Sequence, residues 1–202
     1  RHSKARVRGM KRVQVEPHLS VTGACSAQWV PIKPKTDPAF LYALIHVMLH
    51  EVARERLDLP FLCKRTASPY LIGAGGYYLR DRASRKPLVW NLRTASACVH
   101  DHADIDEALE GRFEVDAIEV GPDGDILGEG LLVGETAFTR LVQHMQPYAP
   151  EWAQAICDVP AASMRQIALD YIAHACVGET IEIEGKTLPF RPVAVTLGKT
   201  VN

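Results

Sequence analysis

The alternation of apolar and polar residues divides the chain into short β-like runs and longer helical segments. Two β-like runs come first, Lys11–Val15, with β-branched residues at alternate positions, and Trp29–Ile32. Apolar residues then recur at helical spacing from Phe40 to Val52 with little polar interruption. This pattern predicts a buried helix that follows two strands, as in a layered α/β domain.

Capping residues mark the expected ends of the first helices. Gly9 is expected to end an N-terminal helix as its C-cap. Asp37 is the expected N-cap of the buried helix, with Pro38 at its first position, where the missing N–H costs nothing. Asp37 and Pro38 together form the strongest helix-start signal in the chain.

The middle of the chain is richer in glycine and β-forming residues. Gly73–Gly76 leads into aromatic and apolar residues, and Lys86–Asn91 has the composition of a strand. Phe113–Val120 begins a predicted hairpin that turns at Gly121–Asp125. This composition predicts an irregular, β-rich excursion from the α/β core.

Helical periodicity returns after the excursion. Thr136–Met145 is one predicted helix, and Pro160–Cys176 is another, with Asp158 or Ser163 as its cap. Gly178 is expected to stop it. Short β candidates follow at 180–184 and 194–197.

The predicted fold class is therefore α/β: a Rossmann-like nucleotide-binding layer domain with a β-rich irregular insertion. Residues 1–69 and 135–202 are expected to form the α/β cofactor-binding core, and residues 70–134 the β-rich excursion. The chain starts with Arg1, and Leu197–Asn202 stops in mid-pattern, which is interpreted as an internal piece of a longer polypeptide.

Composition narrows the possible partners. The 202 residues are 47% hydrophobic and 23% charged, and the net charge of −1 provides no long-range field for nucleic acid. The longest apolar run, Phe40–Leu49, is too short to span a bilayer, so no direct membrane insertion is expected. Five widely spaced cysteines without a C-x-x-C pair favour buried or bystander thiols.

Two acids form the main candidate for binding chemistry. Glu16 closes the first β-like run, where a carboxylate can accept ribose hydroxyls, and Asp37 opens the helix after the second run. Small residues between the runs, including Thr22 and Gly23, permit close backbone approach. Each acid alone also suits a simpler role, as a solvated loop acid or a helix cap. Together they favour a nucleotide site.

Three other motifs have weaker claims. Gly73-x-Gly75-Gly76 stands before a predicted hairpin rather than a helix, so a phosphate cradle is not favoured. Cys98, His100 and His102 would lie on one face of a strand and could hold zinc, although surface histidines are the better interpretation. His46 and His50 lie one helical turn apart but lack the Glu of H-E-x-x-H; they are expected at the core edge and the surface.

Several segments resemble the dimethyl sulfoxide reductase superfamily of molybdopterin oxidoreductases, which carry a bis-molybdopterin guanine dinucleotide cofactor. In that family an acid-Pro-Arg triplet and a Thr-Ala turn precede an Asp-x-Trp-[VI]-Pro-[IV]-[KR]-Pro-Gly-Thr-Asp segment. The counterparts here are Glu16–His18, Thr22–Gly23 and Trp29–Asp37. Segments similar to the family's later sequence follow, in the same order, at Phe61–Thr66, Pro69–Leu71, Tyr148–Ala153, Cys157–Ala161 and Ile167–Ala168.

The resemblance implies a role for each position around the nucleotide. Glu16 would hold the guanosine ribose, and Asp37 would accept hydrogen bonds from the guanine N–H edge. The implied cofactor-binding residues are Glu16, Pro17, His18, Thr22, Pro34, Lys35, Thr36 and Asp37. Lys35 stands where the family has glycine, so a loop that relies on positive φ is expected to be rearranged. His18 replaces the family's arginine and weakens a positive contact.

The resemblance also implies the wider setting. The chain would be an internal fragment of a catalytic subunit whose cofactor contains molybdenum or tungsten. The metal ligand and an iron–sulfur cluster are expected elsewhere in the parent protein. The implied partners are an iron–sulfur electron-transfer subunit of anaerobic respiration and the rest of the catalytic subunit. No compartment is predicted; either the cytoplasmic or the periplasmic face of a bacterial membrane is compatible. The alternative is a non-catalytic α/β nucleotide-binding or scaffold domain.

Overall fold

A computed structural model describes residues 2–197, which form a mixed α/β fold of two compact units. The first unit contains the described residues up to Leu57 and those from Met145 onward; the second is Asp58–His144. The second unit contains the predicted excursion, 70–134, and the helices on either side of it. Residues 1 and 198–202, which the predicted core includes, lie outside the described residues.

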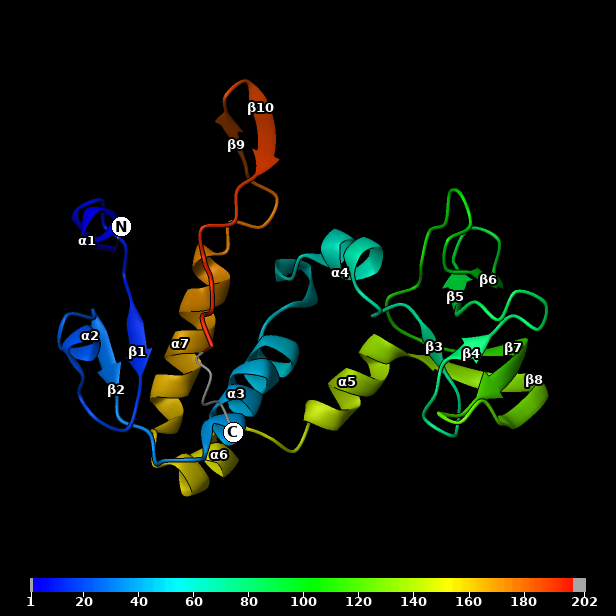
Figure 1. The fold of residues 1–202 in the computed structure, drawn as a ribbon, viewed down its shortest axis with the longest axis horizontal. Helices are drawn as coiled ribbons and strands as arrows, with labels where there is room; N and C mark the ends of the chain where they lie inside the picture. Colours follow the sequence, from blue (N-terminus) through cyan, green and yellow to red (C-terminus); the bar gives the residue numbers. More distant parts are fainter. Residues whose placement is uncertain (1, 198–202) are drawn as a thin grey trace. The chain divides into compact units, whose positions relative to one another are not determined.

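The first unit contains a pair of parallel strands. Strand β1 (Val13–Val15) pairs with β2 (Gln28–Val30), with Val15 opposite Val30 (Figure 1). Parallel strands need a crossover of about a dozen residues, and the segment 16–27 supplies it. The short helix α2 (Val21–Ala24) lies within this crossover. The structure is mixed α/β, and a Rossmann-like layer is not confirmed.

Helices provide the core of the first unit. Helix α3 continues into the π-helical turn η1, and it packs against α6 and α7. The buried core side chains come from the loop after β2 and from all three of these helices, for example Ile32, Phe40 and Met164. The bounds are α1 (His2–Val7), α3 (Asp37–His46), η1 (Val47–Glu51), the 3₁₀ turn η2 (Arg54–Arg56), α6 (Pro150–Cys157), α7 (Ala161–His174), β9 (Thr180–Ile183) and β10 (Lys186–Pro189).

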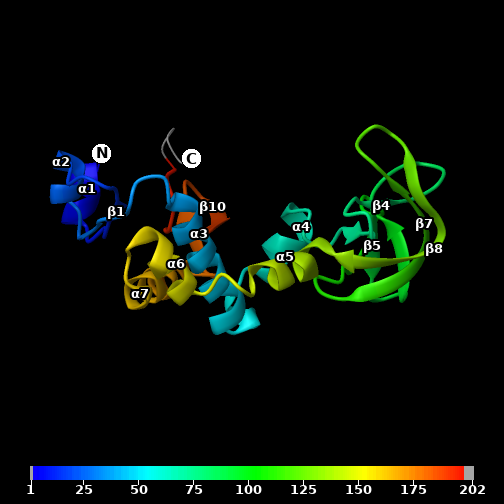
Figure 2. The same ribbon diagram turned by 90° about the horizontal axis from the view of Figure 1, so that it is seen from below.

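The second unit is built around a long, curled antiparallel hairpin (Figure 2). Its four-stranded sheet has the order β3-β8-β7-β4, and a separate pair, β5–β6, covers part of its core. The rings of Trp90 and Phe113 stack there, with centroids 4.4 Å apart. The bounds are α4 (Leu59–Arg65), β3 (Leu71–Ile72), β4 (Leu79–Arg80), β5 (Leu88–Asn91), β6 (Ser96–Val99), β7 (Arg112–Val120), β8 (Ile126–Thr136) and α5 (Ala137–Met145).

Most predicted elements are confirmed, and the errors lie at caps and near the C-terminus. Thr36, rather than Asp37, is the N-cap of α3, so Pro38 takes the second helical position. Pro160 is the N-cap of α7, because Asp158 is instead the left-handed C-cap of α6. The strand predicted at 194–197 is wrong, because these residues are irregular. The two strands before them, β9 and β10, pair with each other.

Within the described residues, no helix combines the length and the apolar character needed to cross a membrane. Their five cysteines are all free thiols, and Cys157 is buried in the core of the first unit.

An arginine on α7 connects three parts of the first unit. The Arg165 guanidinium donates from Nη1 and Nη2 to the two Glu151 carboxylate oxygens at 2.5 and 2.9 Å, and from Nε to Glu51 at 2.8 Å. The hydrogen bonds from Arg165 lower the pKa of Glu151 from 4.5 to about 2. Paired guanidinium and carboxylate groups of this geometry fix η1, α6 and α7 to one another.

The depressed pKa of Glu151 predicts a pH-dependent contribution to stability. Because the folded-state pKa lies below the unfolded value, this contribution is present above about pH 4.5 and disappears as the pH falls towards 2. The Glu151→Gln variant should therefore unfold at a lower temperature than the wild type at pH 7, and the difference should shrink to nothing near pH 2. Thermal unfolding of both proteins between pH 7 and pH 2 checks this prediction, with Glu55→Gln as the control variant. A difference in unfolding temperature that does not change with pH would contradict it.

Candidate functional site

The two predicted acids follow the two parallel strands in the sequence, Glu16 directly after β1 and Asp37 at the start of α3. Glu16 follows β1 directly, and its backbone N–H donates to the Val30 carbonyl at the end of β2, at 3.2 Å. The loop after β2 then runs through residues 31–36 to Asp37 at the start of α3. Ligands of α/β sheets bind outside the carboxyl ends of parallel strands. The fold thus places Glu16 at this edge, beside the first residue of the loop that leads to Asp37.

The Glu16 carboxylate is held by nearby donors. Its Oε1 accepts a hydrogen bond from the backbone N–H of Ser20 at 2.9 Å, and the Ser20 hydroxyl lies 2.8 Å from Oε1 and 3.0 Å from Oε2. Oε2 also accepts from the Gln14 amide at 3.2 Å. The Ser20 backbone bond above all, with the side-chain bonds and the Arg12 charge, lowers the pKa of Glu16. Glu16 is therefore an ionised acceptor with a fixed orientation at neutral pH.

Helix α2 is built around this carboxylate. The Ser20 hydroxyl accepts from the Gly23 backbone N–H at 3.0 Å and so caps the helix. Gly23 is buried, and a methyl group there would overlap Glu16 Oε1. Arg12 Nη2 donates to the Thr22 carbonyl at 2.5 Å and connects the same helix to β1. Gly23 is thus required by the close approach of the acid.

Asp37 has a different environment. It occupies the first turn of α3, where the helix dipole favours a negative charge. Its side chain is half-buried, and it makes no hydrogen bond or ion pair with any other described residue. A carboxylate accepts hydrogen bonds but cannot donate them when ionised. Asp37 is therefore an available acceptor for an external N–H group.

The loop before Asp37 retains a left-handed turn. Lys35 has φ +67°, so the rearrangement expected from the loss of glycine is wrong. The Thr36 hydroxyl donates to the Lys33 carbonyl at 2.6 Å, and the Lys33 N–H donates to the Cys157 carbonyl at 3.1 Å. These two bonds hold the loop against the end of α6, which explains why lysine tolerates this conformation.

The remaining predicted site residues lie on the surface beside the two acids. Exposed side chains are those of Pro17, His18, Thr22, Pro34 and Lys35, whereas Thr36 is half-buried. A shallow cavity of about 680 Å³ lies along α5 in the second unit and contains none of the candidate residues. The candidate site is accordingly an open, polar edge rather than a closed pocket within the described chain.

The glycine-rich loop of the second unit surrounds a protein carboxylate instead of a phosphate. Glu119 on β7 is buried, and its Oε1 accepts from the Tyr77 backbone N–H at 3.0 Å. Gly73 and Gly75 both lie against this carboxylate. The turn also has a hairpin bond, from the Gly73 N–H to the Tyr77 carbonyl at 2.9 Å, which confirms the predicted hairpin. The loop is therefore occupied by a side chain of the same unit.

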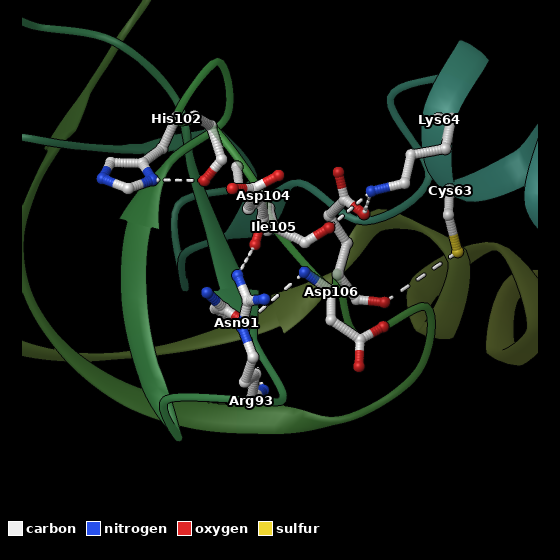
Figure 3. A network of polar contacts seen from close by, with 10 residues as sticks. Cys63, Lys64, Asn91, Arg93, His102, Asp104, Ile105 and Asp106 are labelled. Atoms are coloured by element: carbon white, nitrogen blue, oxygen red, sulfur yellow. Dashed lines mark hydrogen bonds and ion pairs between the residues drawn. The ribbon is translucent and has the colours of Figure 1, made fainter.

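The candidate zinc residues do not assemble. Strand β6 ends at Val99, so His100 and His102 fall in the turn beyond it rather than on one strand face. The His102 ring bonds to the Ala103 carbonyl at 2.7 Å (Figure 3). No group of three metal-ligating side chains occurs among the described residues. His46 is buried and stacks on the exposed His50, as expected for residues at the core edge and surface.

A polar network, drawn in Figure 3, fixes α4 to the loop that carries these histidines. Lys64 pairs with the Glu107 carboxylate, and its ammonium donates to the Ile105 carbonyl at 2.5 Å. Burial and the charge of Glu107 raise the pKa of Cys63, so its thiol stays protonated at neutral pH. Asn91 accepts from the Asp106 N–H. These contacts serve the structure of the second unit.

Comparison with known proteins places the candidate site in context. The chain is 27% identical over 208 residues to the alpha subunit of the perchlorate reductase of Dechloromonas aromatica (strain RCB), a match that covers 84% of this chain and 21% of the relative. It is 26% identical over 182 residues to the alpha subunit of the chlorate reductase of Ideonella dechloratans, covering 81% and 18%. The dimethylsulfide dehydrogenase of Rhodovulum sulfidophilum has an alpha subunit that is 25% identical over 179 residues, covering 80% and 18%.

The chain spans about a fifth of the length of the curated relatives it matches. No protein-family model matches it. The aligned residues cover most of this chain in each case, so the similarity includes both units and is not confined to the candidate site.

The left-handed conformation of Lys35 predicts a stabilising substitution. A left-handed residue with a side chain costs roughly 1–2 kcal/mol, and glycine removes this strain while losing roughly 0.5–1 kcal/mol through chain entropy. Lys35→Gly should therefore raise the free energy of unfolding by about 0.5–1 kcal/mol. Urea unfolding measures this, and Lys35→Ala, which keeps the Cβ, is the control. Equal stability of the glycine and alanine variants would refute the strain argument.

The Gly73 contact predicts a destabilising substitution in the second unit. A methyl group at Gly73 would overlap the Glu119 carboxylate and lie 2.7 Å from Leu79 Cδ2, in a buried region. Gly73→Ala should cost about 1–3 kcal/mol of unfolding free energy through overpacking. Gly128→Ala is the matched control, because a methyl group there meets Leu132 only at 3.4 Å. Equal unfolding midpoints in urea for the two variants would count against this packing.

Proposed function

We propose that this chain forms part of the catalytic subunit of a molybdopterin oxidoreductase. Its relatives are alpha subunits of molybdoenzymes of the dimethyl sulfoxide reductase superfamily. Within such a subunit, the chain would bind the guanine dinucleotide portion of the cofactor. The predicted resemblance to that superfamily is confirmed by four relatives named as subunits of reductases and dehydrogenases. The relatives' names contain different substrates, from perchlorate to dimethylsulfide, so the proposal concerns the cofactor.

The observation that carries the proposal is the state of two acceptors, Glu16 at the carboxyl end of β1 and Asp37 in the first turn of α3. Asp37 is half-buried and has no partner among the described residues, which suits an acceptor for two neighbouring guanine N–H groups. Glu16 is ionised and fixed beside the end of β2, which suits an acceptor for a ribose hydroxyl. Both residues thus match the donors that a guanosine presents.

The other residues would complete the nucleotide site. Pro34, Lys35 and Thr36 form the turn that leads to Asp37, and its two bonds to the loop and α6 keep it in place. Pro17, His18 and Thr22 would border the same site from the β1 side. Because these side chains are mostly exposed, we infer that the rest of the catalytic subunit covers the nucleotide and excludes water.

The bound group would supply the redox chemistry. Molybdenum or tungsten held by the pterin would change oxidation state, whereas the residues of this chain would bind and orient the nucleotide end. An iron–sulfur cluster elsewhere in the protein and an iron–sulfur subunit would pass on the electrons. The chain's own contribution is therefore positional: a fixed carboxylate at the end of β1 and an available one in the first turn of α3.

Removal of the Asp37 carboxylate tests the proposal. Asp37→Ala in the complete protein leaves the guanine N–H edge without its acceptor, which costs about 1–3 kcal/mol, roughly a 5- to 150-fold weaker retention. Asp37→Asn should also lose cofactor, because its amide replaces one of the two acceptor oxygens with an NH2 donor that faces a guanine N–H. The quantities to measure are the amount of bound molybdenum and the amount of released GMP, each per polypeptide.

The control is Asp170→Asn, a change of an exposed helical acid in the same unit. It should leave the molybdenum and GMP content at the wild-type level. Wild-type GMP content in both Asp37 variants would refute the guanine contact.

A further inference from the structure

The Glu16 carboxylate has at most one acceptor position left. An ionised carboxylate offers about four lone-pair positions on its two oxygens. The Ser20 backbone N–H donates to Oε1 at 2.9 Å, and the Ser20 hydroxyl, which has one proton to donate, lies 2.8 Å from Oε1 and 3.0 Å from Oε2. The Gln14 amide donates to Oε2 at 3.2 Å. Three protons thus use three of the four positions, and because the hydroxyl lies nearer to Oε1 we assign the remaining position to Oε2.

These donors cannot easily turn away from Glu16. The Ser20 hydroxyl is fixed from its other side, because it accepts from the Gly23 N–H at 3.0 Å as the cap of α2. The Ser20 backbone N–H is part of the same turn. Gln14 extends from β1, whose register with β2 is set by the pairing of Gln14 with Trp29. The occupied positions are thus defined by secondary structure.

On the premise that the chain holds a guanosine as proposed above, we propose that Glu16 accepts only one of the two ribose hydroxyls, through Oε2. Ser20 and Gln14 are positioning residues, because they fill the positions that a second hydroxyl would need. The site should therefore distinguish the 2′- from the 3′-hydroxyl.

Gln14 is the residue that limits the number of contacts. Its bond to Oε2 is the longest of those to Glu16, at 3.2 Å, and it occupies the same oxygen that retains the free position. A methionine at this position keeps the length of the side chain but donates no hydrogen bond. Gln14→Met would thus free a second position on Oε2 and allow both hydroxyls to bind.

The experiment uses the complete protein prepared without cofactor, titrated calorimetrically with GDP, 2′-deoxy-GDP and 3′-deoxy-GDP. The wild type should bind one deoxy analogue within about 2-fold of GDP and the other at least 5-fold more weakly, since a charge-assisted hydrogen bond is lost. In Gln14→Met both deoxy analogues should bind more weakly than GDP. Equal weakening of both analogues in the wild type, or of neither, would overturn the single contact.

Ser20 variants separate positioning from a structural role. Ser20→Ala removes the hydroxyl from the carboxylate and should reduce the preference between the two deoxy analogues, whereas Ser20→Thr keeps the hydroxyl and should restore it. A preference unchanged in Ser20→Ala would overturn the assignment of Ser20. Failure of the proposed function has another signature: GDP would not bind the wild type, or Asp37→Asn would bind it equally well.

Discussion

The parallel pairing of β1 and β2 is the constraint on which the candidate site depends. The register places Val15 opposite Val30, and the next backbone bond, from Glu16 to the Val30 carbonyl, brings the strand-end acid beside the loop that leads to α3. Glu16 and Asp37 are far apart in the sequence, one after each of the two paired strands. The pairing places Glu16 at the carboxyl edge of the strands, which is where ligands of parallel sheets bind.

The two acids are prepared in different ways for binding. Glu16 is held by donors from its own strand and crossover, which keep it ionised and oriented. Asp37 has no partner among the described residues and sits in the first turn of a helix, whose dipole favours its charge. Glu16 thus has little remaining orientational freedom or capacity to accept hydrogen bonds, whereas Asp37 retains both. A nucleoside, with a ribose hydroxyl for Glu16 and a base edge of N–H donors for Asp37, matches this asymmetry.

Sequence patterns predicted the elements better than their local contacts. The strands before Glu16 and Asp37 and the buried helix follow from hydrophobic periodicity, which reflects burial directly. The hydrogen bonds from Ser20 to Glu16 depend on the loop conformation, which hydrophobic periodicity does not predict. Lys35 shows the same limit, because two backbone-directed bonds in its loop override its steric preference. The buried Glu119 did leave a signal: it falls on the inward phase of the alternation in β7, opposite a glycine-rich loop.

A crystal structure of the complete protein with its cofactor tests the central claim most directly. The account predicts a ribose hydroxyl within about 2.5–3.2 Å of Glu16 Oε2, and guanine N–H groups at a similar distance from the Asp37 carboxylate. It also predicts that the Ser20 and Gln14 bonds to Glu16 persist in the loaded protein. A guanosine bound away from this strand edge, with both carboxylates facing solvent or protein, would contradict the account.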